Sequence, residues 1–403
     1  MKVFAINVVC GTGSTGRIVT DIYHLLTQNG DQCRVAYSRG SAPKEIDAVK
    51  IGSKSDIYGH ALLSRITDKQ GFYSKQATRQ LIEKIREYNP DIIHLHNVHG
   101  YYLNIEILFD FLRIYSKPVI WTLHDCWSFT GHCTHFSRAE CDKWKEGCSK
   151  CPQKKEYPAS LFLDNSKDNW ILKKQIFSGL NLTIVTVSEW LKKMVSQSFL
   201  QDCHVRTIYN GLDLEVFKTT EIDFRKEYGI EDKHLILGVA NVWTKSKGID
   251  DFMQLADMIG DDYRIVLVGV SKQQKKHMKS NMIGIENTSD ARCLAGIYTA
   301  ADVFVNTSVE ETMGMTTVEA LACGTPAIVY NATGIPEVLA DMPEMVVSPH
   351  NIVGVKEMIE RICETGIEQE KLLNIARKFD KWKRFQEYLD LYREVIVCSK
   401  NGD

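Results

Sequence analysis

The stretch VEETMGMTTVEALACGTPAIVY, residues 309–330, has the pattern of a β-α-β unit. It follows the apolar run ADVFVNTS, turns at a glycine, continues through a helix-forming segment and ends in a second apolar run, TPAIVY. The same rhythm recurs in both halves of the chain, with apolar runs such as KVFAINVV, DIIHLH, PVIWTL, LILGVAN and YRIVLVG. Apolar runs that alternate with amphipathic stretches are typical of a mostly parallel sheet covered by helices. We therefore expect an α/β fold.

Length and composition narrow the class of protein. The chain has 403 residues, of which 44% are hydrophobic and 25% charged, as in a globular protein of two or three domains. Its formal net charge of −2 argues against nucleic acid as a partner. We expect no membrane span and no signal peptide, because the apolar runs are too short. A cytoplasmic protein is therefore expected, with its cysteines as reduced thiols or metal ligands.

Two glutamates eight positions apart belong to the loop and helix predicted within residues 309–330. Glu311 would lie in the loop and Glu319 in the first turns of the helix. Gly314 would let the chain turn tightly, which places the amides of Met315 and Thr316 at a helix N-terminus suited to a phosphate. Glu311 and Glu319 could then accept hydrogen bonds from sugar and ribose hydroxyls. The alternative is structural, because Thr316 and Glu319 also match the S/T-x-x-E capping box.

A glycine-rich loop lies near the N-terminus. Residues 8–23, VVCGTGSTGRIVTDIY, contain Gly11, Gly13 and Gly16 in the spacing G-x-G-x-x-G. Such a loop lets the backbone approach a phosphate closely. A dinucleotide site also needs an acid at the end of the second strand, whereas this strand ends in VAYSRG with Arg39. NAD(P), another phosphate or sugar ligand, and a merely tight turn all remain open.

Two lysines follow a predicted strand of the second half. The segment VWTKSKGID places Lys245 and Lys247 beside Gly248. Two cations in such a loop could neutralise a diphosphate, or they could simply be solvated.

Five of the twelve cysteines fall in one predicted insertion, and they are Cys126, Cys133, Cys141, Cys148 and Cys151. A C-x2-C pair with further cysteines upstream suits tetrahedral zinc. We expect structural zinc on Cys133, Cys141, Cys148 and Cys151, with His132, His135 or Cys126 as substitute ligands. Free thiols and redox chemistry are the alternatives. Lysines of the same insertion could contact an anionic membrane surface or form a solvated face.

Together these motifs resemble the retaining glycosyltransferases of family 4, which have the GT-B fold. The resemblance rests on the N-terminal glycine loop, HLHN, TLHD, IYNGLDLEVF, the E-x7-E pattern with ALACGTP, and GTPAIVYNATGIPEVL. It implies two Rossmann-like domains: residues 1–205, with an insertion at about 126–155, and residues 206–383, followed by a helix at 384–403 that packs back on the first domain. The stretch HDCWSFTGHCTHFSRAECDKWKEGCSKCP is similar to a bacterial subgroup that builds colanic acid and O-antigen-type polysaccharides.

The resemblance also implies roles on the donor side. Glu311 would hold sugar hydroxyls, Glu319 the ribose and Lys247 the diphosphate, with the amides at Gly314, Met315 and Thr316 nearby. Gly13 and Gly16 would line the cleft instead of cradling NAD. Similar enzymes carry an arginine where this chain has Val242, and Lys245 could substitute for it as a point charge.

On the acceptor side, the resemblance places His124 near the sugar and the leaving phosphate. Asp125 would orient His124 or cap the next segment. His96 and Asn97 would face the acceptor.

The expected function is transfer of a sugar from a nucleotide sugar, with a UDP or GDP donor, to a saccharide or lipid-linked oligosaccharide, with retention of configuration. No D-x-D sequence occurs, so we expect no catalytic metal. Peripheral contact with the inner membrane is compatible with such an acceptor. The alternatives are an NAD(P)-dependent oxidoreductase and a non-catalytic protein that binds sugar nucleotides.

Overall fold

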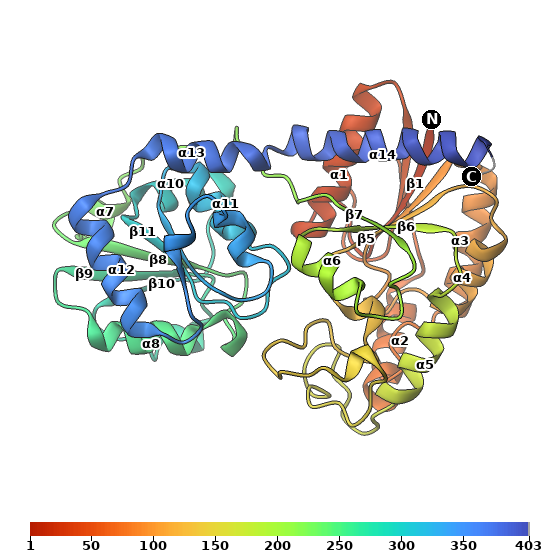
Figure 1. The fold of residues 1–403 in the computed structure, drawn as a ribbon, viewed down its shortest axis with the longest axis horizontal. Coiled ribbons are helices and arrows are strands. Elements are labelled where there is room, and N and C mark those ends of the chain that lie inside the picture. The colour runs from red at the N-terminus through yellow and green to blue at the C-terminus, as the bar shows by residue number, and fades with distance from the viewer. Residues whose placement is uncertain (402–403) are drawn as a thin grey trace. The chain divides into compact units, whose positions relative to one another are not determined.

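The computed structural model describes residues 1–401 and divides the chain into two compact units, each with its own parallel sheet (Figure 1). Unit 1 comprises Met1–Tyr209 and the C-terminal segment from Trp382, and unit 2 comprises Asn210–Lys381. The expected α/β architecture is therefore confirmed. Residues 402–403 of the predicted C-terminal segment lie outside the described residues. Within residues 1–401, no helix has the length and apolar character that a membrane crossing requires.

The sheet of unit 1 has seven parallel strands in the order β3-β2-β1-β4-β5-β6-β7. Its strands are β1 (Lys2–Ile6), β2 (Gln32–Tyr37), β3 (Ala48–Lys50), β4 (Ile92–Leu95), β5 (Val119–Leu123), β6 (Leu182–Thr186) and β7 (His204–Thr207). Its helices are α1 (Gly13–Gln28), α2 (Lys54–Thr67), α3 (Lys75–Tyr88), α4 (Ile105–Ile114), α5 (Ser166–Phe177), α6 (Glu189–Val195) and α14 (Lys381–Asn401). Short 3-10 turns lie at Trp127–Phe129 and Lys143–Lys145.

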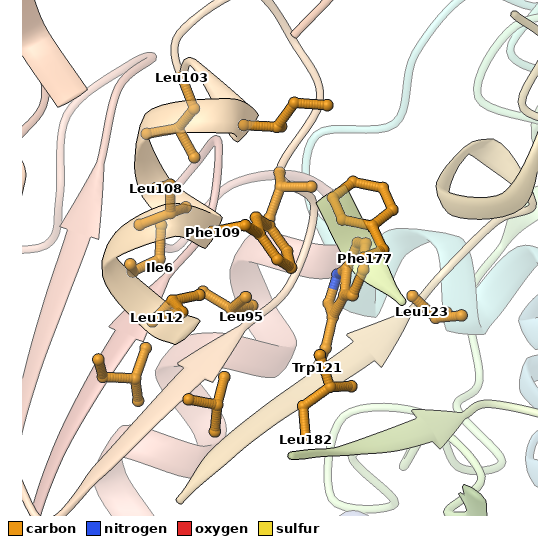
Figure 2. Close-up of a cluster of buried hydrophobic side chains, with 14 of the residues drawn as sticks. Ile6, Leu95, Leu103, Leu108, Phe109, Leu112, Trp121, Leu123, Phe177 and Leu182 are labelled. Atoms are coloured by element: carbon orange, nitrogen blue, oxygen red, sulfur yellow. The ribbon is translucent and has the colours of Figure 1, made fainter. Parts of the chain in front are cut away.

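Apolar residues cover both faces of this sheet because successive strand residues point to opposite sides. Val3 of β1 packs in a cluster with side chains of α1 and with Tyr388 of α14. Its neighbour Phe4 belongs to a second cluster, on the opposite face. There, Trp121 of β5 lies 5.3 Å from Phe109 and 5.0 Å from Phe177, measured between ring centroids (Figure 2). The strands of unit 1 are thus buried on both sides.

The sheet of unit 2 has six parallel strands in the order β10-β9-β8-β11-β12-β13. Its strands are β8 (His234–Val239), β9 (Tyr263–Val268), β10 (Met282–Ile285), β11 (Val303–Asn306), β12 (Ala327–Tyr330) and β13 (Val346–Val347). Its helices are α7 (Phe224–Glu227), α8 (Ile249–Met258), α9 (Lys272–Lys275), α10 (Ala291–Ala300), α11 (Met315–Ala322), α12 (Ile352–Thr365) and α13 (Gln369–Ala376). Turns of 3-10 helix lie at Lys245–Lys247, Ile335–Leu339, Pro343–Met345 and Arg377–Phe379.

Each sheet reverses its strand order once, between β1 and β4 in unit 1 and between β8 and β11 in unit 2. In open parallel sheets, ligands bind beyond the carboxyl ends of the strands at such a point. The glycine loop and His96 follow β1 and β4, whereas Lys247 and Glu311 follow β8 and β11. The topology therefore brings the glycine loop and His96 to one switch point and Lys247 and Glu311 to the other. His124 follows β5, the strand next to β4.

Candidate active site

In unit 2 an ion pair joins the two loops at the switch point. The Nζ atom of Lys247 donates to Oε1 of Glu311 at 2.6 Å, and the Ser308 hydroxyl donates to the same oxygen at 3.2 Å. The Thr333 hydroxyl holds the loop from the other side, because it accepts from the backbone N–H of Glu311 at 3.2 Å. Glu311 is therefore fixed by three partners from three segments, while its side chain keeps 16% of its surface exposed.

Gly248 allows the lysine loop to approach β11 closely. Its φ is +77°, and a methyl group on it would lie 2.6 Å from the carbonyl oxygen of Thr307. The Thr307 hydroxyl in turn donates to the carbonyl oxygen of Lys247 at 3.0 Å. This close approach places Lys247 within reach of Glu311. Lys245 and Val242, in contrast, are both exposed in the same loop.

Helix α11 begins directly after Gly314, which is its N-cap residue with a φ of +83° and no capping side chain. Met315 and Thr316 are therefore in the first turn, where backbone N–H groups lack partners within the helix. The capping-box alternative for Thr316 and Glu319 is wrong, because the residue at the cap is a glycine. The predicted amide cradle remains geometrically available.

Glu319 has a buried partner that sequence reasoning missed. The hydroxyl of Tyr298, on α10, donates to Oε2 of Glu319 at 2.9 Å. Burial, together with the neighbouring Glu319 carboxylate, raises the pKa of Tyr298 well above its usual value, so the hydroxyl stays protonated and keeps donating. Glu319 is thus oriented by a hydrogen bond from another helix.

In unit 1 the three glycines have different structural roles. Gly11 and Gly13 have positive φ, and α1 begins at Gly13, whose surface is exposed. Gly16 lies inside α1, where a methyl group would be 3.3 Å from the backbone nitrogen of Gly11. That nitrogen donates to the carbonyl oxygen of Gly16 at 3.1 Å. Asn7 ties this loop to β4, because its Oδ1 atom accepts from the backbone N–H of Asn97 at 3.3 Å.

The ends of β4 and β5 bring two predicted histidines into contact. Nδ1 of His96 lies 3.1 Å from Nε2 of His124, and the rings are stacked with an interplanar angle of 14°. Burial lowers the pKa of His124 to about 4 and that of His96 well below its usual value. Both rings are therefore neutral at pH 7, so one nitrogen of the pair donates and the other accepts. Within the described residues, the buried Nε2 of His96 has no hydrogen-bond partner.

Asp125 holds His99 and caps the next turn. Its Oδ2 lies 2.7 Å from Nε2 of His99, and its Oδ1 accepts from the backbone N–H of Trp127 at 2.9 Å. Burial acts to raise the pKa of Asp125, but the charge and hydrogen bond of His99 outweigh it and hold the pKa at about 2. The capping role therefore holds, and a residue that sequence reasoning missed, His99, is the partner of this carboxylate. The HLHNVHG segment offered a signal, since His99 follows His96 by three positions.

Comparison with known proteins identifies the family. The family described as Glycosyltransferase Family 4 matches residues 15–216, and the family described as Glycosyl transferases group 1 matches residues 220–379. The chain belongs to this glycosyltransferase family. The protein is therefore a transferase of sugars, and nothing in the comparisons supports an oxidoreductase.

Similar proteins share the whole length of this glycosyltransferase. The "Putative colanic acid biosynthesis glycosyl transferase WcaC" of Escherichia coli (strain K12) is 22% identical over 98% of this chain and 100% of its own. The structure of sucrose-phosphate synthase from Thermosynechococcus elongatus has a TM-score of 0.71 at 15% identity and covers 98% of this chain and 99% of its own. Anabaena Alr3699/HepE in complex with UDP has a TM-score of 0.70 at 14% identity, covering 98% and 100%. This likeness confirms the predicted GT-B fold.

A hydrogen-bond network beneath the histidine pair also escaped sequence reasoning in this glycosyltransferase. The Tyr392 hydroxyl lies 2.6 Å from Nδ1 of His94, and Nε2 of His94 lies 2.8 Å from the Thr122 hydroxyl. The rings of His94 and His96 are 4.0 Å apart between centroids. Tyr392 of α14 is thus linked through His94 of β4 to Thr122 of β5, close to the ends of both strands. The sequence showed an aromatic-rich terminal helix but nothing that paired Tyr392 with a residue 298 positions away.

The four predicted zinc ligands converge on one small cavity. Cys133, Cys141, Cys148 and Cys151 line it together with His132. Within residues 1–401, however, no three His, Cys, Asp or Glu side chains are arranged closely enough to hold a metal ion. Zinc at this position therefore stays a prediction.

Proposed function

We propose that this glycosyltransferase moves a sugar from a nucleoside diphosphate onto a saccharide acceptor with retention of configuration. The observation that carries the proposal is the Lys247–Glu311 pair at the switch point of unit 2. Helix α11 begins at Met315, four positions after Glu311. The cation and the helix N-terminus match the diphosphate of such a donor, and the carboxylate matches the hydroxyls of its sugar.

In this proposal Lys247 and the first amides of α11 bind the diphosphate. Glu311 accepts hydrogen bonds from hydroxyls of the sugar, and Glu319, oriented by Tyr298, accepts from the ribose. Lys245, which is exposed in the same loop, adds a positive charge near the phosphates. A UDP-sugar is the first donor to test, because Alr3699/HepE, with the same fold, has been solved with UDP and with UDP-glucose.

The reaction breaks the bond between the anomeric carbon and the oxygen of the diphosphate, and it forms a bond from that carbon to the acceptor hydroxyl. Negative charge develops on the leaving diphosphate, which Lys247 and the helix amides stabilise. The acceptor proton passes to a leaving phosphate oxygen on the same face of the sugar, which gives retention. In this proposal His124 donates a hydrogen bond to the sugar or to the leaving phosphate. It does so as a neutral imidazole, because burial lowers its pKa to about 4. The absence of D-x-D from the sequence supports a reaction in which the negative charge on the leaving diphosphate is stabilised without a metal ion.

Unit 1 is the proposed acceptor side. His96 and Asn97 follow β4. Nε2 of His96 is buried and has no hydrogen-bond partner among residues 1–401, and it is the proposed contact for an acceptor hydroxyl. Gly13 is exposed at the start of α1 and leaves room for a sugar, whereas Gly16 lets α1 approach the turn at Gly11 closely. A growing, lipid-linked polysaccharide is the proposed acceptor, supported by the likeness to the putative colanic acid transferase.

A structural zinc ion in the cysteine-rich insertion is part of the same proposal. Four cysteines around one cavity support it, because metal binding would draw the thiolates together and fasten a loop region rich in turns. The ion would have no part in the transfer step.

The experiment that tests the function uses Glu311→Gln, which keeps the shape of the side chain and removes its charge. We expect transfer from a UDP-sugar to fall by about 100-fold or more, a typical loss when a group that stabilises the transition state is removed. Affinity for UDP alone should change little, because the diphosphate partners remain. The matched control is Glu344→Gln, whose exposed carboxylate pairs with Lys371 on the surface of unit 2 and should not affect transfer. Wild-type turnover in Glu311→Gln would remove this residue from the mechanism.

A further inference from the structure

Helix α2 of unit 1 exposes large apolar side chains along one face. Tyr58, Leu62, Leu63 and Ile66 are all exposed, and Leu62 keeps 61% of its surface accessible. Their spacing places them on one side of the helix. A surface helix of a globular protein usually turns such a stripe toward the core, so this face of α2 lacks the partner that its sequence implies.

A second exposed segment lies beside this face. Leu161, Phe162 and Leu163 are exposed, with 69% of the surface of Phe162 accessible. The backbone N–H of Leu161 donates to the carbonyl oxygen of Arg65 at 2.8 Å, and that of Leu163 donates to Ile66 at 3.3 Å. These bonds hold the segment against the end of α2 (orange and yellow in Figure 1). We call the combined surface the apolar patch; it consists of Tyr58, Leu62, Leu63, Ile66, Leu161, Phe162 and Leu163.

The patch is unusual for this chain. Of the 17 large hydrophobic residues that are exposed among the described residues, seven belong to it, although it draws on only two short segments. Single exposed apolar side chains are normal, whereas a contiguous group with a polar rim marks a surface that contacts something.

The rim of the patch is basic. Lys54 and Arg65 are exposed on α2 itself, and Lys155 and Lys167 are exposed a few positions before and after residues 161–163. Of the acids in these segments, Glu156 pairs with Arg138, while Asp56 caps α2 and Asp164 accepts from Ser166 and from the backbone of Cys151. Asp168 is exposed beside Lys167, so the four cations outnumber the three carboxylates that have no cationic partner among residues 1–401. An apolar centre within a cationic rim complements a bilayer that carries anionic headgroups. It does not complement a second copy of the same patch, because a symmetric contact would bring the lysines together.

The patch also adjoins the end of the unit 1 sheet. Tyr157, four residues before Leu161, has its hydroxyl 3.4 Å from Nδ1 of His99, whose other ring nitrogen contacts Asp125. Asp125 follows β5 directly, next to His124. A surface that rests on a bilayer here would bring a lipid-borne acceptor close to the proposed acceptor side.

We propose that the apolar patch docks this glycosyltransferase on a membrane surface that contains anionic phospholipids. Phe162 and its leucine neighbours enter the interface between headgroups and acyl chains, and the rim lysines contact the headgroups. The docking does not depend on the proposed donor, acceptor or residue roles, so vesicle binding and transfer can fail separately.

The test is sedimentation of the full-length protein with vesicles of phosphatidylcholine alone and of phosphatidylcholine mixed with phosphatidylglycerol. We expect binding to the anionic vesicles that weakens at high salt. The double variant Leu161→Ser/Phe162→Ser should weaken this binding by about tenfold or more, because it removes exposed apolar surface and leaves the core intact. The matched control is Ile114→Ser, which removes an equally exposed apolar side chain of unit 1 outside the patch.

Charge is tested by a second pair of variants. Lys155→Glu lies on the rim and should weaken binding to anionic vesicles, whereas Lys193→Glu, exposed on α6, should not. Turnover with a water-soluble acceptor should be the same in all four variants. The proposal is overturned if wild-type protein ignores anionic vesicles, if the patch variant binds like wild type, or if Ile114→Ser is equally impaired. It is also overturned if light scattering shows a dimer that the patch variant abolishes while vesicle binding persists unchanged.

Discussion

Replacing Gly248 by alanine should destabilise unit 2 and weaken nucleotide binding together. Gly248 is in the left-handed region, with a φ of +77°, and joins the lysine turn to α8. Its new methyl group would meet Thr307, with the Thr307 carbonyl oxygen at 2.6 Å and its Cβ at 2.5 Å. Part of that obstacle is backbone, so the lysine loop has to move away from β11. Lys247, the adjacent residue, then leaves its position beside Glu311.

Two separate costs set the magnitude. A non-glycine residue in the left-handed region costs roughly 1–2 kcal/mol. Overpacking a tight contact costs roughly 1–3 kcal/mol more. Gly248→Ala should therefore lower the free energy of unfolding of unit 2 by about 2–5 kcal/mol.

Two other glycines of unit 2 separate these costs. Gly229 has a φ of +61°, but no atom lies within 4 Å of the Cβ that alanine would add there. Gly229→Ala should therefore show only the backbone cost of roughly 1–2 kcal/mol. Gly260 has neither feature, and Gly260→Ala should be neutral or stabilise the unit by up to about 1 kcal/mol.

The assay measures the unfolding transition of unit 2 in guanidinium chloride. The affinity for UDP is measured by calorimetry on the same samples. Only Gly248→Ala should lose both stability beyond the backbone cost and affinity for UDP. If its loss of stability lies within about 0.5 kcal/mol of that of Gly229→Ala, the steric reasoning is refuted. If stability falls but affinity does not, Lys247 is not held in place by this turn.

Three further predictions concern unit 1. Tyr392→Phe removes the hydroxyl beside the buried Nδ1 of His94 and should cost about 1–3 kcal/mol in chemical unfolding; an unchanged midpoint would contradict the network. Burial lowers the pKa of His94 to about 3 and of His124 to about 4, whereas the unfolded chain binds these protons near pH 6.5. Stability should therefore be full above about pH 6.5 and fall toward pH 4 by up to about 1.4 kcal/mol per pH unit for each histidine; unfolding at pH 7 and pH 5 checks it, and equal stability would refute it. Inductively coupled plasma mass spectrometry should find about one zinc ion per chain. The zinc should be lost in Cys148→Ser and retained in Cys203→Ser. Wild-type protein that contains no zinc would refute this prediction.

The arrangement of the proposed donor side was the part of the candidate site most accessible from sequence, and the reason is local. Glu311, Gly314 and Glu319 lie within one loop and helix, so their arrangement follows from a single β-α step. The capping-box alternative failed because the same letters fit two helix starts, and only the left-handed Gly314 decides between them. The partner of Glu319, Tyr298, lies on another helix, and the packing that joins them leaves no local signal.

The apolar patch could not be predicted for a different physical reason. A stripe such as Tyr58, Leu62 and Ile66 has the spacing of a core-facing helix, so periodicity alone would bury it. The α/β rhythm predicts helices on both faces of each sheet, but it does not say which side of α2 is turned outward. From the sequence, the lysines of the insertion suggested contact with an anionic surface. The structure adds that neighbouring leucines are exposed, and this exposure is the basis for proposing a membrane contact.

The ion pair of Lys247 and Glu311 bears on how the proposed donor would be recognised. Each side chain is partly exposed, 31% for the lysine and 16% for the glutamate, so a bound donor can reach both partners of the pair. A nucleoside diphosphate alone would take Lys247 as its partner and leave Glu311 with the Ser308 hydroxyl and no sugar. A nucleotide sugar would satisfy both residues, because its diphosphate replaces the carboxylate at Lys247 while its hydroxyls replace the ammonium group at Glu311. On this assignment, recognition of the diphosphate and of the sugar is coupled through one ion pair. A nucleoside diphosphate without its sugar would replace the partner of Lys247 but would not replace the partner of Glu311.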